Sequence, residues 1–301
     1  MRSEPAPACP ICATAAQRPV LVCRDHLVSG ERFGVVECER CGLRMTAPQP
    51  APAEIGRYYE SDDYLPMTRA ARGSLAAVYR LVRRLTVRMR LALVARYAGR
   101  APGRLLDVGC GTGEFLAHAR GAGWSVVGVE PGARAAAQAE GLGLEVRRVH
   151  ALDAVTDGPF DAITMWHALE HMHDPGSQLA RAAALLAPGG CLVVAVPNHR
   201  CADADAYGAA WYAWDVPRHL WHFHTGTLEA LLATRGLVVA AVHAMPFDPF
   251  YIALQSELRG RGGWNVARAA AVATRSALAA RRDPSRACGI AVVARRARGD
   301  A

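Results

Sequence analysis

The segment Leu105–Leu116 has the residue types and spacing of a ligand-binding turn. It reads LLDVGCGTGEFL, in which an apolar run contains Asp107, three glycines then occur at every second position (Gly109, Gly111 and Gly113), and a helical pattern follows. Glycine allows a backbone to turn tightly and to approach a ligand closely. We therefore expect the turn between a strand and a helix here to hold a ligand.

Phosphate-binding loops fit this turn poorly. A Walker loop needs a lysine directly after its last glycine, and the chain contains no lysine because all 35 of its basic residues are arginine. A dinucleotide fingerprint would place its third glycine at Glu114, where a carboxylate would repel a pyrophosphate. The remaining interpretation is a turn that binds a ligand with a cation and a ribose but no phosphate. The alternative is an ordinary turn without a ligand.

The run from Asp107 to Gly113 resembles motif I of the class I S-adenosylmethionine (SAM) methyltransferases. About twenty residues further on, the strand-like Trp124–Gly132 contains Glu130, where Rossmann-like folds have an acidic residue that binds ribose hydroxyls. The resemblance continues through LEH and PGG and covers residues 101–245. The SAM-binding residues that it implies are Asp107, Gly109, Cys110, Gly111, Gly113, Glu130, Pro131, Trp166 and His167.

Strands alternating with helices must position these residues. Strand-like runs occupy Asp161–Met165 and Cys191–Asn198, with a helical pattern and an LAPGG turn (Leu186–Gly190) between them. Near the C-terminus, GLVVAAVHA reads as strand six and CGIAVVARRA as an antiparallel final strand. This order predicts a parallel sheet with ligands at the carboxyl ends of its strands.

Four cysteines near the start of the chain have the spacing of a structural zinc site. Two C-x-x-C knuckles, separated by 25 residues, supply Cys9, Cys12, Cys38 and Cys41, the ligand set of a tetrahedral zinc. No apolar signal segment opens the sequence, so we expect a cytoplasmic protein in which disulfides are disfavoured. A redox pair is the alternative. Cys23 and His26 are expected to be bystanders.

The segment 72–98 predicts a basic amphipathic helix. Its apolar stripe is Leu75, Val78, Val82, Leu85, Met89 and Leu93, and its basic stripe is Arg80, Arg84 and Arg88. Such a helix either lies on an anionic membrane or, more often, packs against its own domain. Just before it, Tyr58, Tyr59 and Tyr64 resemble the segment that folds over the active site in related methyltransferases.

Aromatic residues alternate with polar ones over residues 207–223, as in a binding pocket. The sequence DVPRHLWHFHTGTL resembles an element of zinc-ribbon methyltransferases from sugar and natural-product pathways, and it places His219 where sugar C-methyltransferases have a catalytic histidine. Arg218 replaces their preceding glutamate, which puts C-methylation in doubt. His222 and His224 could instead cap the next helix. The expected acceptor-binding residues are Tyr58, Tyr59, Trp211, Tyr212, Trp214, Arg218 and His222.

The composition, 301 residues with 51% hydrophobic and 21% charged, fits a globular α/β protein. We expect a Rossmann-like seven-stranded methyltransferase sheet with a small N-terminal zinc ribbon and a helical linker. The expected parts are a zinc ribbon (1–50), a linker and basic helix (51–100) and a SAM-dependent methyltransferase domain (101–301) with an insertion at about 245–287.

The predicted function is methyl transfer from SAM to a small-molecule acceptor: a sugar, glycolipid or natural-product intermediate, with O-methylation slightly favoured over C-methylation. One alternative is a zinc-ribbon methyltransferase of ribosomal RNA bases, and another is a non-catalytic SAM-binding protein. The net charge of +8 is a weak argument for nucleic acid, because arginine used without lysine and with much alanine is typical of a GC-rich genome. Basic residues are also not clustered on the ribbon, which argues against the RNA alternative. The oligomeric state does not follow from the sequence.

Overall fold

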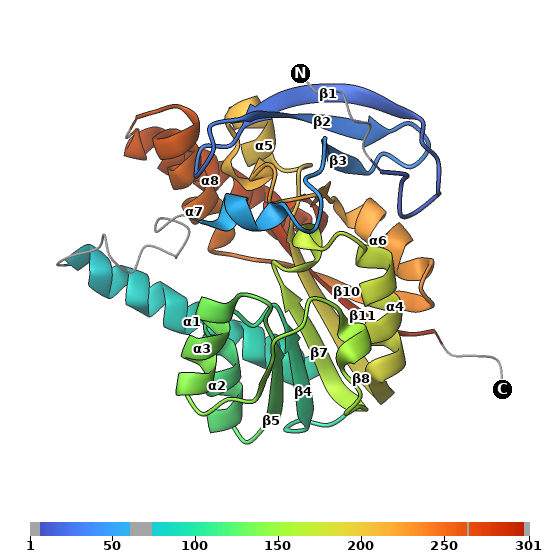
Figure 1. Ribbon diagram of the computed structural model, residues 1–301. Helices are drawn as coiled ribbons and strands as arrows, with labels where there is room; N and C mark the ends of the chain where they lie inside the picture. Colours follow the sequence, from blue (N-terminus) through green and yellow to red (C-terminus); the bar gives the residue numbers. More distant parts are fainter. Residues whose placement is uncertain (1–6, 61–73, 264, 298–301) are drawn as a thin grey trace.

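The computed structural model describes residues 7–60, 74–263 and 265–297, so Tyr64 lies outside the described residues. The chain forms two sheets (Figure 1). A seven-stranded sheet has the order β10-β11-β8-β7-β4-β5-β6, and a four-stranded sheet has the order β1-β2-β3-β9. The smaller sheet lies over one end of the larger one.

The large sheet confirms the predicted architecture. Its strands are β4 (Arg104–Val108), β5 (Ser125–Val129), β6 (Val146–Arg147), β7 (Phe160–Trp166), β8 (Leu186–Pro197), β10 (Leu237–Ala244) and β11 (Gly289–Arg296). Strands β4 to β8 run parallel, and β11 is antiparallel to both β8 and β10. The carboxyl ends of β4, β5, β7 and β8 therefore share one edge.

The predicted LAPGG turn is wrong in one respect: its residues belong to β8. Leu186 pairs with Phe160, and the register then shifts before Cys191 pairs with Ala162. The extra residues form an irregularity within the strand, where Gly189 takes a positive φ of 76°. A glycine there permits a left-handed backbone without ending the pairing.

Helices cover both faces of the sheet. On one face lie α1 (Ser74–Tyr97), α2 (Glu114–Gly121) and α3 (Ala133–Gly141), and on the other lie α4 (Pro175–Leu185) and α6 (Thr225–Ala233) (Figure 1). Because strand side chains alternate, Leu105 packs with the first group and Leu106 with the second. Full burial of such a side chain contributes about 1.5–3 kcal/mol, so the two apolar layers fix the strand that carries the glycine turn.

Helix α1 forms where the basic helix was predicted, but a different face packs. Val87, Leu91 and Val94 are buried against the sheet, whereas Leu85 and Met89 are 37% and 47% exposed. The packed face is set by tertiary contacts that the helical periodicity alone does not reveal. Membrane contact through this helix stays a prediction. Among the described residues, no helix is both long and apolar enough to span a bilayer.

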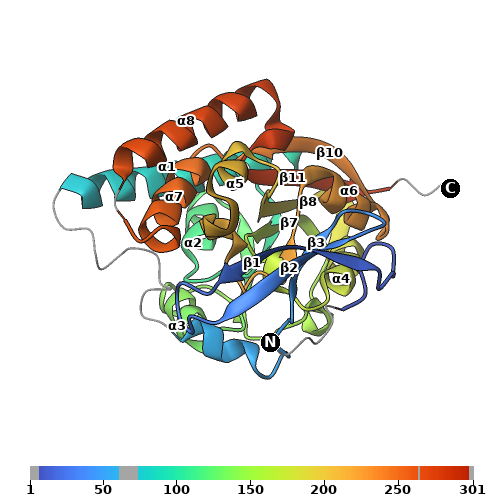
Figure 2. The same cartoon turned by 90° about the horizontal axis from the view of Figure 1, so that it is seen from above.

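The N-terminal strands β1 (Gln17–Arg24), β2 (Arg32–Cys38) and β3 (Arg44–Ala47) form an antiparallel meander. A short strand from the aromatic loop, β9 (Trp221–His222), pairs with β3. From above, β1 to β3 lie across the carboxyl edge of the large sheet (Figure 2). The N-terminal segment is thereby joined by backbone hydrogen bonds to the loop that carries His219.

The chain between β10 and β11 is mainly helical. It contains α7 (Asp248–Gln255), a π-helical turn η6 (Ser256–Gly260), α8 (Val266–Arg282) and η7 (Pro284–Arg286). Helices α7 and α8 lie side by side and contact α5 (Ala202–Tyr207) (Figure 2). Short 3-10 turns complete the fold: η1 (Ile55–Tyr59), η2 (Leu152–Ala154), η3 (Leu169–His171), η4 (Gly208–Ala210) and η5 (Tyr212–Trp214).

Candidate functional site

The glycine turn follows β4 directly, as predicted. Gly109, Gly111 and Gly113 all have positive φ, at 73°, 56° and 79°. A Cβ at Gly109 would lie 2.8 Å from the Cβ of Ala168. A Cβ at Gly113 would lie 2.5 Å from the side chain of Leu144. The glycines are therefore required both by backbone conformation and by close approach, and Gly109 contacts the loop that follows β7.

Two carboxylates flank this turn. Asp107 is buried and accepts a hydrogen bond from Thr164 Oγ1 at 2.6 Å, and burial raises the pKa of Asp107 to about 7. Glu130, just after β5, accepts hydrogen bonds from the backbone N–H groups of Gly111 at 2.9 Å and Gly132 at 2.7 Å. A carboxylate offers about four lone-pair sites, so Glu130 can support the turn and still bind hydroxyls.

An arginine that the sequence interpretation missed lies beside the turn. The guanidinium carbon of Arg90, on α1, lies 4.8 Å from the ring centre of Trp166 at the end of β7. Its Nε atom is buried without a hydrogen-bond partner, and desolvation lowers the pKa of Arg90. The only sequence signal was that Arg90 stands outside the exposed stripe of Arg84 and Arg88.

Trp166 and Arg90 also line a cleft of about 330 Å³ between α1 and the start of α7. Met89, Leu93 and Met245 give this cleft largely apolar walls. Phe115 of α2 packs edge-on against Trp166, with ring centres 5.6 Å apart. The cleft therefore begins at the strand ends that carry the glycine turn.

The loop after β7 brings several titratable groups together. His167, with a φ of 56°, lies between two carboxylates: its Nδ1 is 3.4 Å from Glu170 Oε1 and its Nε2 is 3.4 Å from Asp248 Oδ2. Burial opposes protonation of His167, but the two neighbouring carboxylates, Asp248 and Glu170, outweigh it and raise the pKa of His167 to about 9. Burial likewise opposes the charge of Glu170, yet the surrounding histidines lower its pKa.

His219 packs against the far end of this loop. Its Nδ1 lies 2.9 Å from the carbonyl oxygen of Ala213, so Nδ1–H donates and the neutral ring keeps its lone pair on Nε2. Nε2 lies 4.0 Å from Glu170 Oε1 and 3.9 Å from Asp215 Oδ2. The ring of His171 contacts His219 edge-on at 4.6 Å.

The loop from His167 to His171 thus connects two predicted sites. Ala168 meets Gly109 at one end, and Glu170 faces His219 at the other. His219 does not line the cleft that contains Trp166. The potential ligand atoms of Glu170, His171 and His219 lie within 4.8 Å of one another, so these three residues form an acid–base group at the end of the loop that contacts Gly109.

Comparison with known proteins gives the same assignment. A family model described as a methyltransferase domain matches residues 79–242, which is more than half of the chain. A ubiquinone biosynthesis O-methyltransferase of Xanthomonas oryzae pv. oryzae (strain PXO99A) is 31% identical over 177 residues, 54% of this chain and 74% of that protein. The chain is a class I SAM-dependent methyltransferase.

One further relative and one solved structure resemble the methyltransferase to different extents. A ubiquinone biosynthesis O-methyltransferase of Caulobacter sp. (strain K31) is 38% identical over 103 residues, but the match covers only 32% of this chain and 41% of that protein. A chain in the complex between the Haloferax volcanii Trm112 methyltransferase activator and a methyltransferase is 16% identical with a TM-score of 0.51, covering 74% of this chain and 94% of that chain. This last likeness shows the fold alone.

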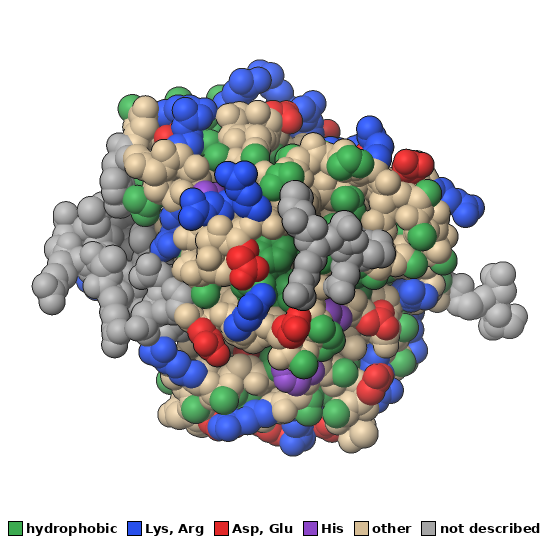
Figure 3. Space-filling model, turned by 45° about the horizontal axis from the view of Figure 1, so that its top comes forward, with side chains coloured by type: hydrophobic (Ala, Val, Ile, Leu, Met, Phe, Trp, Pro, Cys, Tyr) green, Lys and Arg blue, Asp and Glu red, His purple; other side chains and the backbone are tan. Residues whose placement is uncertain are grey.

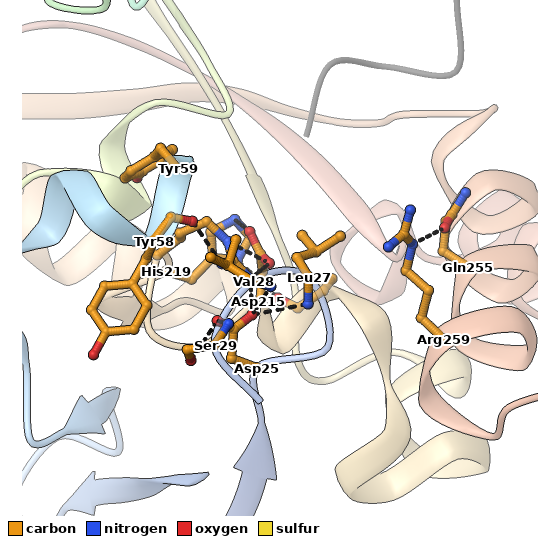
Figure 4. A network of polar contacts seen from close by, with 12 residues as sticks. Asp25, Leu27, Val28, Ser29, Tyr58, Tyr59, Asp215, His219, Gln255 and Arg259 are labelled. Carbon is orange, nitrogen blue, oxygen red and sulfur yellow. Dashed lines mark hydrogen bonds and ion pairs between the residues drawn. The ribbon is translucent and has the colours of Figure 1, made fainter. Parts of the chain in front are cut away.

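Arg218 of the methyltransferase, which the sequence predicted to bind the acceptor, is instead buried in ion pairs. Its side chain is 1% exposed, and Nη2 lies 2.9 Å from Asp25 Oδ1 and 2.6 Å from Asp215 Oδ1. Nη1 donates to the backbone carbonyl of Tyr58 at 2.9 Å. Figure 4 shows how the Asp25 turn, Asp215, Tyr58 and His219 come together at this point. The arginine joins the N-terminal sheet to the loop that carries His219.

Most of the predicted aromatic pocket is likewise packed in this structure. Trp211 and Trp214 are buried and contact each other edge-on, and the Trp214 indole N–H donates to the carbonyl of Gly208. His222 is buried with its Nε2 3.0 Å from Thr46 Oγ1. The sequence predicts a pocket here, but Trp214 and His222 pack where β9 joins β3, and Trp211 packs in the same buried cluster as residues of β1 and β2. These three residues would need to rearrange to reach an acceptor.

Of the remaining predicted acceptor residues, one is buried and two are partly exposed. Tyr58 is buried and donates its hydroxyl to Glu31 at 3.0 Å. Tyr212 is partly exposed and packs edge-on against Tyr251. Tyr59 is partly exposed with its hydroxyl oxygen 3.0 Å from His171 Nδ1. Of these residues, Tyr59 is the one that contacts the acid–base group. His224 is the N-cap of α6, as its alternative interpretation expected.

The four knuckle cysteines lie together at one end of the N-terminal sheet. The Sγ atoms of Cys9 and Cys41 are 3.4 Å apart and those of Cys12 and Cys38 are 3.5 Å apart, and all four lie within 4.8 Å of one another. A tetrahedron of thiolates with metal–sulfur bonds of about 2.3 Å has edges of about 3.8 Å. The donor set therefore fits a tetrahedral zinc. Cys23 is not part of this cluster.

Proposed function

We propose that this methyltransferase transfers the methyl group of SAM to a hydroxyl of a small-molecule acceptor, such as a sugar or a natural-product intermediate. The observation that carries the proposal is the link between the glycine turn and the Glu170–His219 pair through a single loop. Two relatives that share part of the chain are named as O-methyltransferases, which supports oxygen as the methylated atom.

The chain's own residues would hold SAM at the edge formed by β4, β5 and β7. Glu130 would bind the ribose hydroxyls, and the glycine turn would bring the backbone close to the ligand. Arg90 would bind the carboxylate of the methionine part, because its guanidinium has no ion pair or hydrogen bond with the described residues and carboxylate is the partner it fits best. The other proposed contacts are Asp107, Cys110, Pro131, Trp166 and His167.

When bound, SAM supplies a methyl group on a positively charged sulfur that leaves as a neutral thioether. The protein mainly has to align the acceptor oxygen with that methyl group, and such positioning is worth several kcal/mol. His219 Nε2 would take the proton of the acceptor hydroxyl, and the Glu170 carboxylate would stabilise the resulting imidazolium. Base catalysis of this kind contributes about a hundred- to ten-thousand-fold.

We also propose that Cys9, Cys12, Cys38 and Cys41 bind one structural zinc. A ribbon of some fifty residues has little core of its own, and comparable zinc peptides gain about 10–16 kcal/mol from the metal. Residues 1–50 would then form the ribbon, 51–100 the linker and helix, and 101–301 the methyltransferase domain. The ribbon would hold Asp25 against Arg218 and so position the loop that carries His219.

The alternative of ribosomal RNA methylation has less support. On the face shown in Figure 3, arginine side chains are spread among acidic and apolar ones instead of forming a continuous basic surface. Phosphate contacts to a long RNA would need such a surface.

Formation of S-adenosylhomocysteine (SAH) from SAM tests the proposed function. We expect release of SAH with members of a panel of small hydroxyl compounds, including sugars and phenols, and no methyl incorporation into ribosomal RNA. Methylation of RNA alone, or tight SAM binding without turnover on any acceptor class, would contradict the proposal.

A further inference from the structure

A second cleft, of about 600 Å³, opens beside the end of β8. Its walls come from β3, the turn after β8, the start of α6 and η7. Because β8 runs parallel to β4 and β7, this turn lies at the same sheet edge as Gly109 and His167, and β7 alone separates β8 from β4. We call it the β8 cleft. None of the residues assigned to SAM or zinc lines it.

The β8 cleft is basic. Three arginines line it, Arg44, Arg200 and Arg286, against one carboxylate, Asp205. Arg44 already pairs with Glu37 at 2.9 Å. Within the part of the chain that the structure describes, the exposed guanidinium groups of Arg200 and Arg286 have no hydrogen bond or ion pair. Two positive charges therefore remain available for a ligand.

Two histidines in the same wall, the buried His199 and the half-buried His224, lack hydrogen-bond acceptors. His199 is 4% exposed, its ring is stacked near Trp214, and neither of its ring nitrogens has a partner among the described residues. His224 Nδ1 accepts from the N–H of Gly226 at 3.2 Å, so a neutral His224 carries its proton on Nε2, which is buried and also has no partner.

Both histidines stay neutral, and this determines what they can bind. Burial, helped by nearby arginines, lowers the pKa of His199 to about 2 and that of His224 to about 4. Each neutral ring then presents one N–H donor, and an unsatisfied buried donor is costly. The two arginine side chains and one N–H group of each histidine are all donors, so they favour a ligand that accepts several hydrogen bonds.

We propose that the β8 cleft binds a phosphate group, and that this group belongs to the methyl acceptor. A phosphate ester has three free oxygens and can accept from donors on several sides, which matches Arg200, Arg286 and the histidine wall. The assignment to the acceptor rests on the proposed function, whereas the anion site itself does not. Trp214, which stacks near His199, lies on the same loop as His219, so an occupied cleft would adjoin the catalytic loop.

Calorimetric titration of the full-length protein with pyrophosphate tests this inference. We expect wild-type protein to bind pyrophosphate, and the double variant Arg200→Gln/Arg286→Gln to bind it at least about tenfold more weakly, as expected for lost charge-assisted hydrogen bonds. The matched control is Arg84→Gln/Arg88→Gln, which removes the same charge from exposed positions on α1 and should change pyrophosphate affinity less than about twofold. SAH affinity should be unchanged in both variants.

Other outcomes would overturn the inference. Absence of pyrophosphate binding by the wild type, or an equal loss in the α1 control, would show that no specific phosphate site exists. A short single-stranded RNA that binds more tightly than pyrophosphate, and is lost in the Arg200/Arg286 variant, would assign the cleft to nucleic acid instead of a small acceptor. Failure of the wild type to bind SAH would refute the proposed function. The pyrophosphate titration would still decide whether the β8 cleft binds phosphate.

Discussion

Substitution of Arg90 by methionine should weaken binding of the methionine part of SAM without affecting binding of its adenosine part. Methionine is similar in length and apolar, so it can keep the contact with Trp166 while removing the guanidinium. A charge-assisted hydrogen bond contributes about 1.5–3 kcal/mol, which corresponds to about a 10- to 150-fold loss of affinity. Arg90→Met should therefore weaken SAH, which has the methionine carboxylate, by that factor.

The comparison ligand is 5′-methylthioadenosine, which has the adenosine and thioether of SAH but no carboxylate. Calorimetry should show its affinity for Arg90→Met within about twofold of that for wild type. The exposed neighbour Arg88→Met is the matched control and should bind both ligands normally. Removal of a desolvated, unpaired cation should also leave the melting temperature unchanged or higher. Equal weakening of both ligands, or of neither, would refute the role given to Arg90.

Three further predictions follow from buried or clustered groups. Arg218→Met leaves Asp25 and Asp215 without their shared cation, so it should lower the free energy of unfolding by about 3–5 kcal/mol. Urea denaturation measures this loss, and a loss below about 1 kcal/mol would contradict the buried ion pairs. Cys38→Ser should reduce metal content from about one zinc per chain to near zero with SAH affinity retained, and iron or no metal in the wild type would contradict the zinc site. The pKa of His167 is raised to about 9 in the folded state from about 6.5 unfolded, so its stabilisation is complete below pH 6.5 and disappears as the pH rises through about 9. His167→Gln should flatten the fall in urea stability over that range, and an unchanged slope would exclude the His167 ion pairs.

The large sheet was predictable because its signals are local. The glycine turn at Gly109, Glu130 after the next strand and the alternation of strands with helices specify a Rossmann-like order without knowledge of distant contacts. The cluster of four cysteines was predictable for the same reason, since each knuckle is a four-residue turn. Such features depend on residues that are neighbours in the sequence.

The acceptor region was predicted less well because its contacts are long-range. The aromatic loop indicates a pocket by composition, yet Trp214 and His222 pack where β9 joins β3, and Arg218 pairs with Asp25 from the other end of the chain. Arg90 was missed because its position outside the stripe of Arg84 and Arg88 is a weak signal, and in a chain of many arginines it does not show which one contacts Trp166. The positions of these side chains depend on contacts between distant parts of the chain, and a single sequence does not reveal those contacts.

The central claim is that His219 is the base of a SAM-dependent methyl transfer, and turnover of His219→Asn tests it most directly. Asparagine can still donate to the Ala213 carbonyl, so the loop should keep its structure while the basic Nε2 is lost. We predict SAH affinity within about twofold of wild type and a kcat for SAH formation reduced at least about a hundredfold. Near-normal turnover would contradict the role of His219 as the base.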